Sequence, residues 1–116
     1  MIHPDTDEGR ISIAVYRPKP GREAELLRVV AGHLPLLRAE GLATAREAIV
    51  MQAADGTILE VFEWVSAAAI DEAHHNPLVM AHWERLGEAS DHLPLKDLAE
   101  AVSLFAGFRP LPAGAT

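Results

Sequence analysis

The stretch that decides the fold is AIVMQAADGTILEVFEW, residues 48–64. It contains two runs rich in β-branched and other apolar residues, which is typical of strands. The dipeptide Asp55-Gly56 lies between the two runs, and in this position it is the strongest short-range signal of a β-hairpin. The sequence therefore predicts two antiparallel strands joined by a tight turn.

Upstream of this hairpin the sequence predicts one strand and one helix. Residues 11–17, ISIAVYR, alternate in polarity and favour a strand. The segment PKPG at 18–21 ends this strand, and apolar residues then recur at helical spacing over residues 22–40. Gly41 is suited to the left-handed backbone position that commonly follows a helix.

Downstream of the hairpin the sequence predicts a short helix, a longer helix and a last strand. Ser66 is suited to cap a helix over residues 67–75. The pair Asn76-Pro77 combines a capping residue with proline at the first helical position, and it predicts a second helix from residue 77 to about residue 90. A connector over residues 93–101 then leads to a strand over residues 103–109.

This order of elements predicts an α+β fold with ferredoxin-like β-α-β-β-α-β order, in which an antiparallel sheet carries helices on one face. A chain of 116 residues has the usual size of one domain. We expect this single domain to span residues 11–109. We also expect a flexible leader at residues 1–10 and a loose tail at residues 110–116.

The second strand of the hairpin has two largely apolar faces. Its apolar residues are Ile58, Phe62 and Trp64 on one face and Leu59 and Val61 on the other, with Glu60 and Glu63 interrupting the pattern. An antiparallel sheet with helices on one side is normally polar on its other side unless something covers it. We therefore expect a homodimer in which two sheets pack face to face.

Composition and charge exclude several classes of protein. The net charge of −7 and the scattered basic residues argue against a partner that is nucleic acid or anionic lipid. The absence of cysteine excludes disulfides, thiolate catalysis and cysteine-based metal sites. The first ten residues lack the features of a signal peptide, and no apolar run is long enough to span a membrane. We expect no membrane association and a cytoplasmic location.

Three segments together resemble a known family. These are YRPKPGREAEL at 16–26, ADGTILEVFEWVS at 54–66 and AIDEAHHNPLVMAHWERL at 69–86. In this order and at these distances they resemble the antibiotic-biosynthesis-monooxygenase-like domains of the dimeric α/β-barrel superfamily. The resemblance covers residues 11–109 and implies a ligand cavity between the helices and the concave sheet of each protomer.

Members of this superfamily include cofactor-free oxygenases that act on polycyclic phenols and enzymes that degrade heme. The heme-degrading branch has an asparagine on its first strand, and ISIAVYR contains none. When the segment WVSAAAI at residues 64–70 is aligned with that branch, Ala73 falls where the branch has a tryptophan. Heme degradation is therefore not expected, and the resemblance favours the phenol-oxidising branch.

His74 is the candidate catalytic residue. On the predicted helix it shares a face with Ile70 and Ala73, whereas the adjacent His75 points away because a helix turns about 100° per residue. An imidazole directed into a cavity could act as a general base or bind a phenolic oxygen. The alternative is a packing histidine at the end of a helix.

Five further residues are candidates for contact with the substrate. They are Tyr16, His33, Trp64, His82 and Trp83. The two tryptophans are suited to an aromatic ligand, or they anchor helices on the sheet. Tyr16 is either a proton donor in the cavity or an aromatic residue of an interface, and the two histidines lie at the edges of apolar helical stripes. Because no two histidines are four residues apart, we expect no metal site.

These observations lead to two hypotheses of function. The first is a cofactor-independent monooxygenase-like protein that acts on a small aromatic or phenolic metabolite in a cavity between helices and sheet. The alternative is a non-catalytic dimeric barrel that binds a hydrophobic small molecule or has an accessory role. We expect no cofactor, because a phenolate or carbanion of the substrate can react with dioxygen directly in the first case, and the sequence contains no flavin or metal motif.

Overall fold

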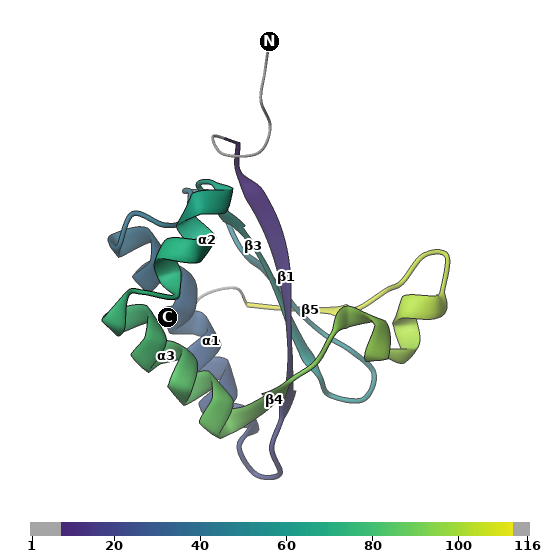
Figure 1. The fold of residues 1–116 in the computed structure, drawn as a ribbon. Helices are drawn as coiled ribbons and strands as arrows, with labels where there is room; N and C mark the ends of the chain where they lie inside the picture. The colour runs from purple at the N-terminus through teal and green to yellow at the C-terminus, as the bar shows by residue number, and fades with distance from the viewer. Residues whose placement is uncertain (1–7, 113–116) are drawn as a thin grey trace.

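The computed structural model describes residues 8–112, which form a five-stranded antiparallel sheet and three α-helices. Figure 1 shows that all three helices lie on one side of the sheet, while a segment near the C-terminal end projects from the other side. This arrangement of helices and sheet is an α+β architecture and is consistent with a ferredoxin-like fold.

The elements follow the predicted order from the first strand to the third helix, but the short strand that follows this helix was not predicted from the sequence. The strands are β1 Arg10–Pro18, β2 Ile49–Gln52, β3 Ile58–Trp64, β4 Ser90–His92 and β5 Arg109–Leu111. The helices are α1 Glu23–Ala39, α2 Ala67–Ala73 and α3 Pro77–Ala89, and two short 3₁₀ turns are η1 Leu95–Asp97 and η2 Ala99–Val102. None of the helices in residues 8–112 has the length and apolar character needed to cross a membrane.

The strands are arranged in the order β4-β1-β3-β2-β5. The predicted hairpin is confirmed: β2 pairs with β3, and Gly56 in the turn has a φ of 94°, which favours glycine. Strand β1 pairs with β3 along its length, from Arg10 opposite Trp64 to Tyr16 opposite Ile58. On its other side β1 pairs with β4 only through residues 16–18.

The predicted helix caps are also confirmed. The Ser66 hydroxyl oxygen accepts a hydrogen bond from the backbone N–H of Ala69 at the start of α2. The Asn76 side-chain oxygen accepts hydrogen bonds from the N–H groups of Leu78 and Val79 at the start of α3. Each cap satisfies backbone donors that have no partner inside the helix.

Most of the hydrophobic core lies between the helices and the sheet. Its largest fully buried apolar side chains on this side are Leu26, Val29, Leu37, Val79 and Leu86. The outer side of the sheet is covered only in part, where Val15 and Leu59 pack against Leu98 near η2. Farther along the same side, Ile11 and Ile49 are exposed.

The prediction of a strand over residues 103–109 is wrong. The last strand comprises residues 109–111, so it includes part of the predicted tail, and residues 103–107 belong instead to the segment that projects from the sheet in Figure 1. Three apolar residues of this segment, Val102, Leu104 and Phe105, are each at least 90% exposed. Leu104 and Ala106 alternate along the sequence as in a strand, but the exposed side chains have no surface of their own chain to pack against. Most of the predicted leader, residues 1–7, lies outside the described residues.

The cap at Ser66 can be tested by substitution. Ser66→Ala removes the oxygen that accepts from Ala69, and we expect the free energy of unfolding to fall by about 1 kcal/mol. Ser66→Asp keeps an acceptor and places a negative charge at the helix N-terminus, so stability should be retained. Urea denaturation measures both variants, and equal losses would show that the cap is not the stabilising contact.

Candidate functional site

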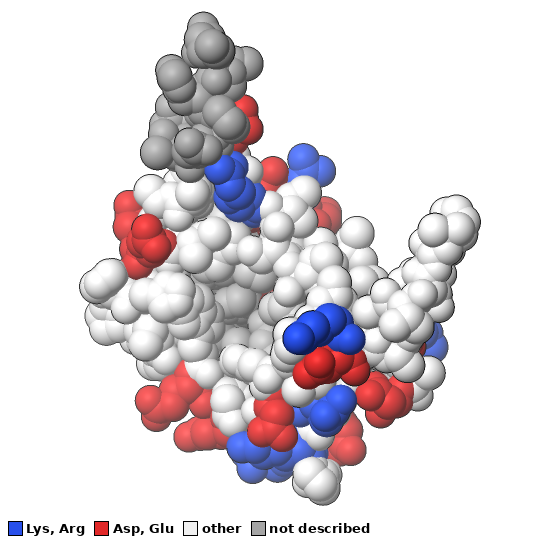
Figure 2. All heavy atoms as spheres, turned by 45° about the vertical axis from the view of Figure 1, so that its right-hand side comes forward, with Lys and Arg blue, Asp and Glu red and all other residues white. Residues whose placement is uncertain are grey.

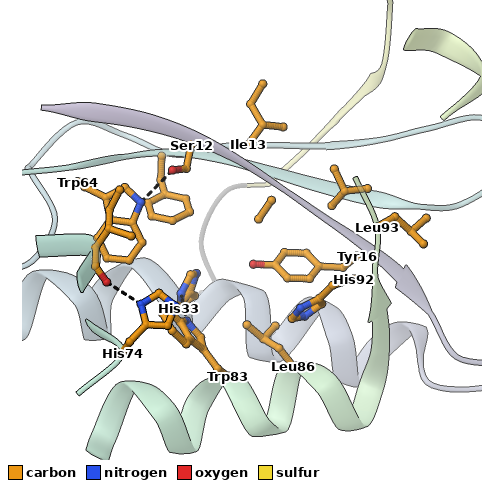
Figure 3. A pocket seen from close by; sticks show the side chains of 14 residues that line it. Ser12, Ile13, Tyr16, His33, Trp64, His74, Trp83, Leu86, His92 and Leu93 are labelled. Carbon is orange, nitrogen blue, oxygen red and sulfur yellow. Dashed lines mark hydrogen bonds between the residues drawn. The ribbon is translucent and has the colours of Figure 1, made fainter. Parts of the chain in front are cut away.

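A cavity of about 410 Å³ lies between α2, α3, β1 and the helix-facing side of the sheet. Its lining is mainly apolar and aromatic and comprises Ser12, Ile13, Ala14, Val15, Tyr16, His33, Phe62, Trp64, Ile70, His74, Trp83, Leu86, His92 and Leu93. Of these, Ile13 and Val15 belong to the stretch of β1 beside the cavity, but their side chains lie on the outer side of the sheet. Figure 2 shows a hollow among uncharged side chains, with charged groups gathered mainly below and beside it. Figure 3 shows the side chains that line this cavity.

Aromatic rings form much of the wall. Phe62 and Trp64 project from β3, and their ring centroids are 5.3 Å apart. The indole N–H of Trp64 donates a hydrogen bond of 2.9 Å to the Ser12 hydroxyl, which fixes the ring across β1 (Figure 3). On the opposite wall, the rings of His74 and Trp83 meet edge to face at 4.9 Å. Large flat rings held in this way suit a flat, apolar ligand.

A buried polar network occupies the inner end of the cavity. The hydroxyl of Tyr16 donates to Oε1 of Glu60 over 2.9 Å, and Nδ1 of His33 lies 2.9 Å from the same oxygen. Tyr16, His33 and Glu60 are each no more than 3% exposed. Strands β1 and β3 and helix α1 therefore each contribute one ionisable side chain to a single hydrogen-bonded group.

Trp83 determines the protonation of this network. Its indole nitrogen lies 2.9 Å from Nε2 of His33, and an indole N–H can only donate. Nε2 of His33 must therefore be the acceptor, so the imidazole is neutral and carries its proton on Nδ1. That proton is donated to Glu60, which accepts from both His33 and Tyr16. Accepting from two donors is the pattern of an ionised carboxylate.

Tyr16 remains a neutral hydroxyl. Burial raises the pKa of its phenol well above the ordinary value, and the negative charge of Glu60 raises it further. Because its proton is donated to Glu60, the lone pairs of the Tyr16 oxygen remain available as acceptors. Tyr16 lines the cavity, and Figure 3 shows its hydroxyl end pointing into the group of labelled side chains.

His74 lies at the outer end of the cavity. Its Nδ1 is 2.8 Å from the carbonyl oxygen of Ile70, so Nδ1 carries the proton of the neutral ring and Nε2 has a free lone pair. His74 is exposed, which lets it exchange a proton with water. The adjacent His75 makes the corresponding bond to Asp71 and does not belong to the cavity lining, as the helical phase predicts.

His82 lies behind the cavity rather than in its lining. It is buried between α3 and α1, where its Nε2–H donates to the carbonyl oxygen of Val29 over 2.7 Å. Its ring stacks on that of His33 at 5.7 Å, and a Cβ atom on Gly32 would lie 3.3 Å from it. Burial lowers the pKa of His82, and the hydrogen bond to Val29 opposes this only in part. These contacts make His82 a bridge between two helices.

The structure brings together all of the other predicted site residues. Tyr16, His33, Trp64, His74 and Trp83 all line the cavity. Ser12 and His92 in the lining, and Glu60 behind it, were not predicted from the sequence. Glu60 could have been identified from the sequence, because it lies on the same, helix-facing side of β3 as Ile58, Phe62 and Trp64. A carboxylate on an otherwise apolar strand face indicates a specific polar partner.

No group of three or more His, Cys, Asp or Glu side chains in residues 8–112 could hold a metal ion. Comparisons of the chain with family models, with curated proteins and with solved structures found no match. The side chains of the cavity are therefore what indicates its chemistry. They combine aromatic walls with a proton-accepting nitrogen at the outer end and a hydrogen-bonded carboxylate behind the inner end.

The lowered pKa of His82 makes stability depend on pH. The folded protein binds this proton more weakly than the unfolded chain, so the free energy of unfolding should fall as the pH drops below about 6.5, the ordinary pKa of histidine. His82→Gln keeps an N–H that can reach Val29 but does not titrate. Between about pH 7 and pH 5, the slope of the free energy of unfolding against pH should therefore be smaller for His82→Gln than for wild type. The two slopes should differ by at most about 1.4 kcal/mol per pH unit.

Urea denaturation over this pH range measures the slope for His82→Gln. His75→Gln is the matched control, because it removes an exposed histidine from the neighbouring segment. Identical slopes for wild type and His82→Gln would contradict the assignment.

Proposed function

We propose that this cavity binds a small aromatic, phenolic metabolite and that the protein is a cofactor-independent monooxygenase acting on it. The observation that carries the proposal is the combination of aromatic walls with free acceptor atoms on Tyr16 and His74. The volume of about 410 Å³ lies within the range of small-molecule sites. The resemblance of the sequence to antibiotic-biosynthesis-monooxygenase-like domains points to the same class of ligand.

In the proposed reaction His74 accepts a proton through its free Nε2 and favours the phenolate form of the substrate. Electron-rich phenolates can transfer electrons to dioxygen without a cofactor. A ring CH₂ group then becomes C=O, one oxygen atom of dioxygen enters the product, and the other leaves as water with the two hydrogens. The carbon loses four electrons and dioxygen gains four, so no external reductant is needed.

We also propose that two copies form a homodimer through the outer side of the sheet. The exposed Ile11, Ile13 and Ile49 lie on that side, and a lone sheet face of this kind is normally covered. The apolar tip of the projecting segment, with Leu104 and Phe105, lies beyond the same side of the sheet (Figure 1). In a two-fold dimer each copy supplies both the face and the tip, so the two surfaces could cover each other.

The role of His74 can be tested with ligands. A panel of polycyclic phenols screened by thermal shift should contain stabilising compounds, because a ligand at a hundred times its Kd adds about 2.7 kcal/mol. His74→Ala should weaken the binding of such a compound and reduce the oxygen uptake that it supports. His75→Ala is the matched control and should change neither, since His75 does not line the cavity. Stabilisation without oxygen uptake would favour the non-catalytic binding protein. Equal effects of His74→Ala and His75→Ala would show that His74 is a packing residue.

The dimer can be tested by placing a charge on each side of β3. Val61 is partly exposed on the outer face, so Val61→Asp should yield a folded monomer. Phe62 belongs to the helix-side core, so Phe62→Asp should unfold the chain. Leu78→Asp, which alters an exposed apolar residue of α3, is the matched control and should stay dimeric. Sedimentation at micromolar concentration distinguishes these outcomes, and a wild-type mass of 12.5 kDa would refute the dimer.

A further inference from the structure

We propose that Glu60, acting through the hydroxyl of Tyr16, accepts the proton of a phenolic hydroxyl group bound at the inner end of the cavity. This inference rests on the proposed function, because it requires a phenolic ligand. It adds a second proton acceptor, which is distinct from His74 because it is buried, whereas His74 is exposed. The evidence is the direction of each hydrogen bond in the buried network.

Tyr16 is the part of the network that a ligand can reach. It lines the cavity, whereas Glu60 is 1% exposed and lies behind it. The Tyr16 hydroxyl donates its proton to Oε1 of Glu60 over 2.9 Å, so its oxygen presents lone pairs to a donor in the cavity. A phenolic O–H of the ligand is such a donor, and its proton then has a continuous path to the carboxylate.

Glu60 is in the state needed to receive that proton. Its partners in residues 8–112, Tyr16 and His33, both donate to it, and neither is a lysine or an arginine. His33 cannot balance its charge as an imidazolium, because the N–H of Trp83 occupies Nε2 of the imidazole. The carboxylate therefore carries a buried negative charge held by neutral donors, and taking up a proton removes that charge.

The step balances without any co-reactant. The phenolic O–H bond of the ligand breaks as its proton bonds to the oxygen of Tyr16, and the original Tyr16 O–H bond breaks as that proton bonds to Oε1 of Glu60. The products are a phenolate in the cavity, a neutral Tyr16 and a protonated Glu60. Tyr16 need not become a stable anion, which agrees with its raised pKa.

His33 and Trp83 are positioning residues in this scheme. The chain of bonds from Trp83 through His33 to Glu60 holds the carboxylate facing Tyr16. With one acceptor at the inner end and His74 at the outer end, the preferred ligand is an aromatic compound with a hydroxyl group at one end and a second hydrogen-bonding group at the other. This narrows the substrate class of the proposed function.

The probe for the test is 4-nitrophenol, because its phenolate absorbs at a longer wavelength than the neutral phenol. Quenching of tryptophan fluorescence measures its binding to the full chain, and absorbance at saturation measures how much of the bound probe is ionised. For wild type we expect the ratio of phenolate to phenol in the bound probe to exceed that of Glu60→Gln by about tenfold, the equivalent of one pH unit. Tyr16→Phe, which keeps the charge of Glu60 but breaks the path, should show the same loss.

Two further variants distinguish proton transfer to Glu60 from a general effect of charge and from proton transfer to His74. Glu63→Gln is the matched control, because Glu63 lies on the same strand but bonds to Thr44 and Arg46 outside the cavity, and it should behave like wild type. 4-Nitrophenol has a single hydroxyl group, which we place at Tyr16 and not at His74. His74→Ala should therefore weaken binding while leaving the ionisation of this hydroxyl group unchanged, although His74 can accept a proton from a ligand with a second hydroxyl group.

Each contrary outcome has a distinct meaning. If ionisation depends on His74 and not on Glu60, the inference about Glu60 is overturned while the proposed function stands. If the probe does not bind to wild type at all, both the inference about Glu60 and the proposed function are overturned. A Glu60→Gln variant that binds and ionises the probe like wild type also overturns the inference.

Discussion

An ionised carboxylate in a protein interior must be hydrogen-bonded, and this requirement on Glu60 connects the elements around the cavity. Tyr16 in β1 and His33 in α1 donate hydrogen bonds to Glu60, and Trp83 in α3 holds His33 in place. Helix α1 and helix α3 are thus fixed to the sheet by directional contacts as well as by apolar packing. Removing one donor would leave a buried charge incompletely satisfied, which costs more than the bond itself contributes.

The same network gives the cavity two different ends. At the inner end the polar groups are buried, and Tyr16 and His33 both donate hydrogen bonds to Glu60. At the outer end His74 is exposed and its free nitrogen can exchange protons with water. A buried ion held by neutral partners lowers stability compared with an apolar core. The stability of the fold alone therefore does not account for this carboxylate in the core.

The sequence was sufficient to predict features that depend on local signals. Asp55-Gly56 indicated the hairpin, and Ser66 and Asn76 indicated the helix starts, because turns and caps are formed by residues close together in the chain. The network could not be predicted, because Tyr16 and His33 lie 44 and 27 residues from Glu60. The position of His82 behind the cavity likewise depends on how α1 and α3 pack. The last strand was misplaced because alternating apolar residues indicate a strand only where another strand or surface lies beside them.

The register between β1 and β3 determines both sides of the sheet at once. With Ser12 opposite Phe62 and Tyr16 opposite Ile58, Ser12 and Tyr16 of β1 face the helices, and the isoleucines of β1 face the other way. A slip of one residue would exchange these two sets, because successive side chains of a strand point to opposite faces. The hydroxyl of Tyr16 would then leave Glu60, and the isoleucines would fill the cavity. The cavity and the apolar outer face are therefore consequences of one pairing, so the sequence cannot specify one without specifying the other.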